Sequence, residues 1–183
     1  DHRVTSAGDV CIVGGSYGGY ATLAGLTLTP TAFKCGVDIV GPSNLITLAE
    51  SVPPHWKPRI SVLPRRMGDW STPEGKAALL AVSPLTHVDA ITRPLLIGQG
   101  ANDPRVKQSE SDQIVAAMQK HGIPVTYVLF PDEGHGFHRP ENNIAFNAVV
   151  EGFLATVLGG RVEPLGAALA ASTAQVLTGE DMV

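Results

Sequence analysis

The sequence lacks several features that would indicate particular classes of protein. It has no block of like charge, because its 13 basic and 17 acidic residues are spread along the chain and leave a formal net charge of −4. This argues against nucleic acid or an anionic membrane as a partner. No apolar run approaches the roughly 18 residues of a membrane-spanning helix, and the charged start "DHR" does not resemble a signal peptide. We expect a soluble domain; a cytoplasmic, periplasmic or secreted location is open.

Cysteine is also scarce. Cys11 and Cys35 each lie in an apolar, strand-like stretch, and neither has the spacing of a metal ligand. We therefore expect two buried free thiols rather than a disulfide or a zinc site.

The chain contains enough apolar residues for one domain with a core, since 44% of its 183 residues are hydrophobic. Short apolar runs rich in β-branched residues predict strands that are buried on both faces; they span residues 10–15, 35–40, 94–100 and 124–130. Between and after them, three segments have helical composition, at 17–29, 108–121 and 141–158, and glycines follow the last two. This alternation predicts an α/β fold, a mostly parallel sheet with flanking helices.

Two stretches fall outside the alternation. Residues 51–93 are rich in proline, which indicates an excursion that contains short helices. After Gly160 the chain turns to small residues, so we expect 1–160 to form the folded domain and 161–183 to be a partly disordered tail.

The stretch "VCIVGGSYGGYATLAG" places Gly14, Ser16 and Gly18 in a Gly-x-Ser-x-Gly pattern at a strand-to-helix turn. Such a turn lifts the serine hydroxyl above the sheet. The backbone N–H of Tyr17, at the start of the helix, would meet an oxyanion formed there. A glycine-rich turn with a buried serine is the plainer interpretation. A third interpretation is a dinucleotide-binding loop in which Asp38 would contact the ribose, but Ser16 replaces the middle glycine of the Gly-x-Gly-x-x-Gly motif.

An acid and a base follow in the order that an α/β-hydrolase requires. Asp103 lies in "GQGANDPRV", just after the strand at 94–100, and His135 lies in "FPDEGHGF", after the strand at 124–130. The carboxyl ends of parallel strands share one edge of the sheet, so both residues can meet Ser16 there. Asp132 and Glu133 are too close to His135 along the chain to be obvious orienting acids. We predict a Ser16–His135–Asp103 triad, which needs no metal or organic cofactor.

These motifs resemble one known family. "GGSYGGYAT", "GANDPRV" and "FPDEGHGF" are similar to the catalytic domain of prolyl oligopeptidase family serine peptidases, in particular the acylaminoacyl-peptidase and dipeptidyl-aminopeptidase-like branch. The resemblance runs from about residue 10 to 158. It implies that Ser16 is the nucleophile, His135 the general base and Asp103 the orienting acid, and that Tyr17 supplies one oxyanion N–H.

The resemblance also implies what to expect of the whole. In this family, half the sheet and usually a β-propeller precede the nucleophile, so the chain is expected to be a C-terminal part of an α/β-hydrolase fold without the second oxyanion donor. The expected function is hydrolysis of short peptides. A carboxylesterase with the same triad and an inactive fragment that self-associates are the alternatives. The apolar strand at 10–15 would become an edge strand, which favours a homo-oligomer.

Overall fold

The computed structural model describes residues 5–6, 8–52, 62–164 and 166–182. Five strands form one sheet in the order β1-β2-β3-β4-β5. They span Cys11–Gly15, Cys35–Ile39, Leu95–Gly100, Thr126–Phe130 and Gln175–Thr178. The first four are parallel, and β5 runs antiparallel to β4. The four strands predicted from the sequence are thus confirmed, with ends that differ by at most two residues.

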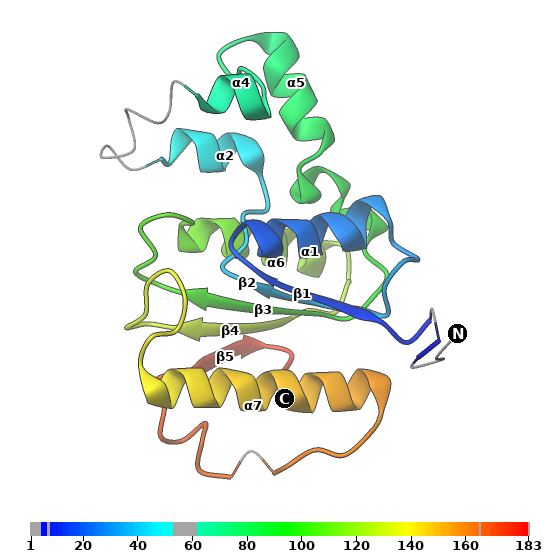
Figure 1. Cartoon of the computed structure of the whole chain (residues 1–183), viewed down its shortest axis with the longest axis vertical. Coiled ribbons are helices and arrows are strands. Elements are labelled where there is room, and N and C mark those ends of the chain that lie inside the picture. Colours follow the sequence, from blue (N-terminus) through cyan, green and yellow to red (C-terminus); the bar gives the residue numbers. More distant parts are fainter. Residues whose placement is uncertain (1–4, 7, 53–61, 165, 183) are drawn as a thin grey trace.

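Helices cover both faces of the sheet, as the predicted α/β fold requires (Figure 1). Helices α1 (Tyr17–Leu28) and α6 (Gln108–Lys120) lie on one face, and α7 (Pro140–Leu158) lies on the other. None of the helices in the described ranges has the length and apolar character needed to cross a membrane.

Each strand contributes to two cores because successive side chains point to opposite faces. Leu95 and Ile97 of β3 pack with α1 and α6, whereas Leu96 between them packs with α7. The continuous apolar runs in the sequence follow from this burial on both sides.

The expectation of two free thiols was wrong: Cys11 and Cys35 form a disulfide. The two cysteines are register partners on the parallel strands β1 and β2, with Cα atoms 4.6 Å apart. Sequence reasoning assessed each cysteine within its own strand. Their pairing depends on the register between strands, which is a tertiary property.

The proline-rich excursion contains short helices, as expected, in its described part. Within 51–93 these are helices α4 (Leu63–Met67) and α5 (Pro73–Ala81) and the 3-10 helix η2 (Pro84–Ala90). Helix α2 (Leu45–Glu50) lies between β2 and the predicted excursion. Figure 1 shows α2, α4 and α5 above the layer of α1 and α6, on the side away from the sheet. Residues 53–61 of the predicted excursion lie outside the described residues.

Within the segment 161–183, expected to be partly disordered, β5 and the 3-10 helix η3 (Glu180–Met182) are ordered elements that we did not predict. β5 pairs with the edge of β4, and Val176 packs against the core on the α7 face. The sequence signal for β5 is weak because the strand has only four residues and few large side chains. It forms by pairing with β4, which lies about 50 residues earlier in the chain.

Candidate active site

Ser16 lies in the sharp turn between β1 and α1. Its backbone has φ 58° and ψ −115°, and its N–H donates to the Ile39 carbonyl at 2.8 Å. Close approach of strand and helix depends on Gly14, because a Cβ there would lie 2.2 Å from the Gly18 carbonyl oxygen. A positive φ in a non-glycine residue is strained, and the surrounding packing holds Ser16 in that conformation.

Asp103 lies in the loop after β3, where its side chain is fully buried. Its Oδ1 accepts the backbone N–H groups of Arg105 at 2.8 Å and Val106 at 2.9 Å. These two bonds fix the carboxylate and leave Oδ2 to face the histidine.

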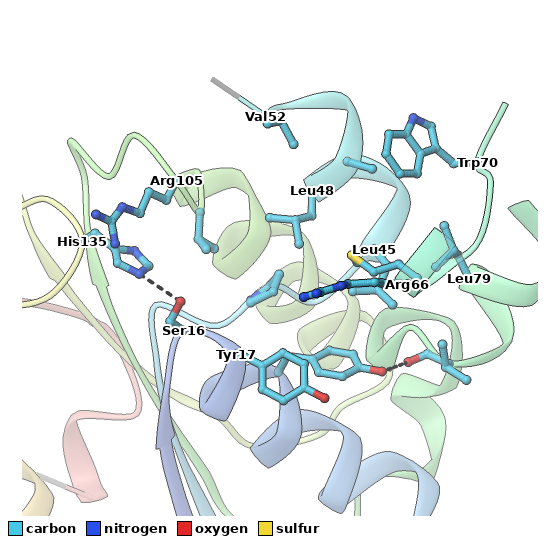
Figure 2. Close-up of a pocket in the computed structure, with 16 residues that line it drawn as sticks. Ser16, Tyr17, Leu45, Leu48, Val52, Arg66, Trp70, Leu79, Arg105 and His135 are labelled. Carbon is cyan, nitrogen blue, oxygen red and sulfur yellow. Dashed lines mark hydrogen bonds between the residues drawn. The ribbon is translucent and has the colours of Figure 1, made fainter. Parts of the chain in front are cut away.

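His135 lies in the loop after β4 and contacts both other residues. Its Nδ1 is 2.7 Å from Asp103 Oδ2. Its Nε2 is 2.9 Å from Ser16 Oγ, the contact that Figure 2 marks with a dashed line. The loops can come this close because Gly100 has no side chain; a Cβ there would lie 2.2 Å from the Gly134 carbonyl oxygen. The structure therefore brings together Ser16, His135 and Asp103, which the sequence separates by up to 119 positions.

Glu133 closes the loop that carries His135, a role that sequence reasoning missed. Its carboxylate is buried and accepts the backbone N–H groups of His138 at 3.1 Å and Arg139 at 2.9 Å. The backbone carbonyl of Glu133 accepts the N–H of Asn102, the residue before Asp103, at 2.9 Å. Glu133 thus connects the two loops without touching the serine. No pattern in the sequence distinguishes it from a surface acid.

Tyr17 is the first residue of α1, so its backbone N–H has no acceptor within the helix. Its side chain is largely exposed, 5.7 Å from the ring of Tyr20 between centroids. The helix N-terminus carries partial positive charge beside Ser16. An oxyanion that forms at the serine would be stabilised from this side.

A cavity of about 410 Å³ opens beside Ser16 and His135. Its walls are mainly apolar and include Leu45, Leu48, Leu79 and Val82. In Figure 2 the Ser16–His135 pair lies at one end and Trp70 at the other. The Tyr20 hydroxyl donates to the Val82 carbonyl at 3.0 Å and ties α1 to this wall. An apolar group of a substrate fits this cavity while a carbonyl lies near Ser16.

Asp38 lies on β2 beside the nucleophile strand, in register with Gly14. Its side chain is fully buried, and neither carboxylate oxygen has a hydrogen-bond partner among the described residues. This burial raises the pKa of Asp38 to about 7; the nearby Gly41 N–H, which does not reach hydrogen-bond geometry, lowers it by a smaller amount. Because it is enclosed, Asp38 has no access to a ribose, which removes the remaining support for a dinucleotide loop.

The arrangement at Ser16 is suited to nucleophilic chemistry. The serine hydroxyl can donate its proton to His135 Nε2 while Asp103 accepts from Nδ1 and holds the ring in one tautomer. In the described part of the chain, no three His, Cys, Asp or Glu side chains gather as metal ligands would.

Comparison with known proteins places the chain among the members of one family. A model described as the prolyl oligopeptidase family matches residues 1–161. Dipeptidyl aminopeptidase BIII of Pseudoxanthomonas mexicana is 66% identical over 180 residues, which cover 98% of this chain and 26% of the relative. Dipeptidyl peptidase family member 6 of Caenorhabditis elegans is 52% identical over 162 residues, which cover 88% of this chain and 22% of the relative.

Among solved structures, a Mycobacterium tuberculosis puromycin-hydrolyzing peptidase superposes with a TM-score of 0.80 at 29% identity. The match covers 88% of this chain and 24% of that one. The chain thus spans about a quarter of the length of the relatives it matches.

Proposed function

The chain belongs to the prolyl oligopeptidase family, and from that premise we propose that the complete protein hydrolyses short peptides by acyl transfer to Ser16. The observation that carries the proposal is the hydrogen-bonded series Ser16–His135–Asp103 at the mouth of an apolar cavity. A serine held this way beside a cavity can attack a carbonyl whose neighbouring side chain occupies that cavity.

In the proposed reaction, Ser16 Oγ attacks the scissile carbonyl as His135 Nε2 removes its proton. The Tyr17 N–H donates to the oxyanion of the tetrahedral intermediate. His135 then gives the proton to the leaving amine, and the C–N bond breaks to leave an acyl-ester on Ser16. A water, deprotonated by His135, releases the acid and restores the serine.

Names of relatives support peptides as the substrate class. Two relatives, at 66% and 52% identity, are named a dipeptidyl aminopeptidase and a dipeptidyl peptidase family member. We extend that activity to this protein, as release of dipeptides from the amino terminus of short peptides.

The test compares two kinds of substrate in the complete protein: a dipeptide 4-nitroanilide with a free amino terminus, and a simple acyl ester without one. We expect turnover of the anilide, lost after treatment with a serine-directed fluorophosphonate. Turnover of the ester alone would contradict the proposal and support a carboxylesterase.

The same assay on the 183-residue chain tests the inactive-fragment alternative. The chain spans about a quarter of its relatives' length, so we expect it to be much less active than the complete protein. Equal turnover would contradict this expectation and leave the proposed chemistry in place.

A further inference from the structure

Glu110 is a second buried glutamate, with a relative exposure of 1%, in the first turn of α6. Its carboxylate accepts the backbone N–H of Ser43 at 3.0 Å, the backbone N–H of Asn44 at 2.9 Å and the side-chain amide of Gln113 at 2.9 Å. The hydroxyl of Thr47 donates to its other oxygen. All these donors are neutral groups. A carboxylate enclosed in this way is held by several oriented donors at once. The Glu110 side chain and these donors therefore have few alternative arrangements.

The donors belong to the segment that begins the cavity wall. Ser43 and Asn44 directly precede α2, Thr47 lies within it, and Leu45, Leu48 and Ala49 of α2 line the cavity. The same segment is held from its other side, where Ser83 Oγ accepts the Leu45 N–H at 3.0 Å. The start of α2 is therefore fixed between α6 and the end of α5.

Helix α6 is also connected to Asp103, the acid of the proposed triad. It follows the Asp103 loop directly, and Ser111 Oγ donates to Gln99 of β3 at 2.9 Å. Glu110 thus joins the apolar wall to the strand end that holds Asp103.

We propose that Glu110 is a positioning residue that sets the preference of the site for apolar substrate side chains, because it holds the α2 wall against the triad-bearing strand ends. The inference rests on the proposed function and adds its determinant of specificity. Among the described residues, Glu110 forms no hydrogen bond with Ser16 or His135, so its effect on the site passes through the segment that begins α2.

The experiment uses the complete protein and two dipeptide anilides that differ only in the residue that supplies the scissile carbonyl, leucine in one and glycine in the other. The readout is the ratio of the two kcat/KM values. In Glu110→Ala we expect this ratio to fall by about tenfold to a hundredfold, since a misplaced wall forfeits the contacts that only leucine makes. Most of this fall should come from a higher KM for the leucine substrate.

Glu133→Ala is the matched control, because Glu133 is also buried and also holds a loop by backbone N–H groups, but that loop carries His135. It should lower kcat for both substrates together and leave their ratio nearly constant. Glu110→Gln should restore most of the ratio, since its amide oxygen can still accept from Ser43 and Asn44 and its NH₂ group can donate to Thr47 Oγ.

A milder variant guards against loss of folding. Thr47→Val keeps the shape of the side chain and removes one bond between α2 and Glu110. It should lower the ratio by about threefold and speed hydrogen exchange of the α2 amides, since the segment then opens more readily.

An unchanged ratio in folded Glu110→Ala and in Thr47→Val would overturn the inference, as would an equal loss with both substrates like that of Glu133→Ala. These results would leave the proposed function intact, because the wild type would still cleave both anilides. Absence of turnover in the wild type would instead overturn the proposed function, and the inference with it.

Discussion

Two regions that meet at Ser16 are built in different ways. The catalytic edge, which consists of Ser16, the Asp103 loop and the His135 loop, lies at the carboxyl ends of β1, β3 and β4. The pocket side, which consists of α2, α4 and α5, lies beyond the helices that cover one face of the sheet (Figure 1). The sheet's backbone ladder places the strand ends of the first region, and the Asp103 and Glu133 carboxylates hold its two loops by accepting backbone N–H groups. A few side-chain bonds, from Glu110, Ser83 and Tyr20, fix the second.

Under the proposed function, the catalytic edge carries out the reaction and the pocket side selects the substrate. Strand ends in a parallel sheet keep their spacing whatever lies above them, so under the proposed function the catalytic edge would perform one reaction on many substrates. The pocket side can change shape by altering a few side chains, without disturbing the sheet. Mutations in the catalytic edge should therefore reduce all turnover, and mutations on the pocket side should change which substrates are used.

The largest effect is expected at the nucleophile. Ser16→Ala should abolish fluorophosphonate labelling and lower kcat of the complete protein by roughly 10⁴ to 10⁶ for every substrate. Labelling followed by peptide mapping measures this directly. Labelling at another serine, or turnover that survives for one substrate class, would break the division between the two regions.

The acid should be nearly as sensitive. Asp103→Asn should lower kcat by about 10⁴, because an amide at Oδ2 no longer favours the tautomer with a proton on Nδ1. Asp132→Asn is the control, since Asp132 bonds Asn142 and Thr173 on the tail side. Steady-state kinetics on both variants decide the assignment; a harmless Asp103→Asn beside a crippling Asp132→Asn would mean that the orienting carboxylate is wrongly identified.

A change on the pocket side should have a smaller and selective effect. Ala49 lines the cavity, and Ala49→Phe would fill part of it. We expect kcat/KM for a leucine substrate to fall by about tenfold to a hundredfold, with a much smaller loss for glycine. Equal losses for the two substrates would show that this cavity does not receive the substrate side chain.

The buried acid beneath the elbow should affect stability rather than specificity. The pKa of Asp38 in the fold, about 7, lies above its ordinary value of 3.8, so the folded state binds the proton more tightly than the unfolded one. Stability therefore falls as pH rises from about 4 to about 7 and then levels off.

Asp38→Asn removes this dependence. The melting temperature of Asp38→Asn minus that of wild type should therefore be a few degrees higher at pH 8 than at pH 4.5. Asp89→Asn, at an exposed position, is the control. A wild-type protein whose melting temperature follows that of Asp38→Asn at every pH would contradict the assignment.

The smallest expected effect is weak self-association of the 183-residue chain. Among the described residues β1 pairs only with β2, and Val13 on it is 52% exposed. An unprotected apolar edge favours pairing with a second copy, and a symmetric dimer closes the contact. Sedimentation at micromolar concentration should detect the dimer, and Val13→Lys should dissociate it. A monomeric wild-type chain would show that this edge does not promote association.

Most of the catalytic edge could be predicted from the sequence because its signals are local. The apolar runs that become β1 to β4 and the glycines around Ser16 are each readable within a few residues. Asp103 and His135 follow strands directly, so their meeting was predictable once the strands were taken as parallel.

The rest depended on partners far apart in the chain. Cys11 and Cys35 pair because β1 and β2 align in register, and β5 is a strand because the edge of β4 is free to receive it. Glu110 reaches back 67 positions to Ser43, and nothing in "QSESDQ" marks it as buried.

The sequence by itself thus determined the α/β alternation and the three residues of the candidate triad, since strand propensity and turn chemistry act between neighbours. Only the tertiary structure decided the disulfide, the added strand, the walls of the cavity and the two buried glutamates, of which Glu133 holds the His135 loop and Glu110 the start of α2. Those features arise when distant segments pack, and their energy lies in contacts that no short stretch of sequence contains.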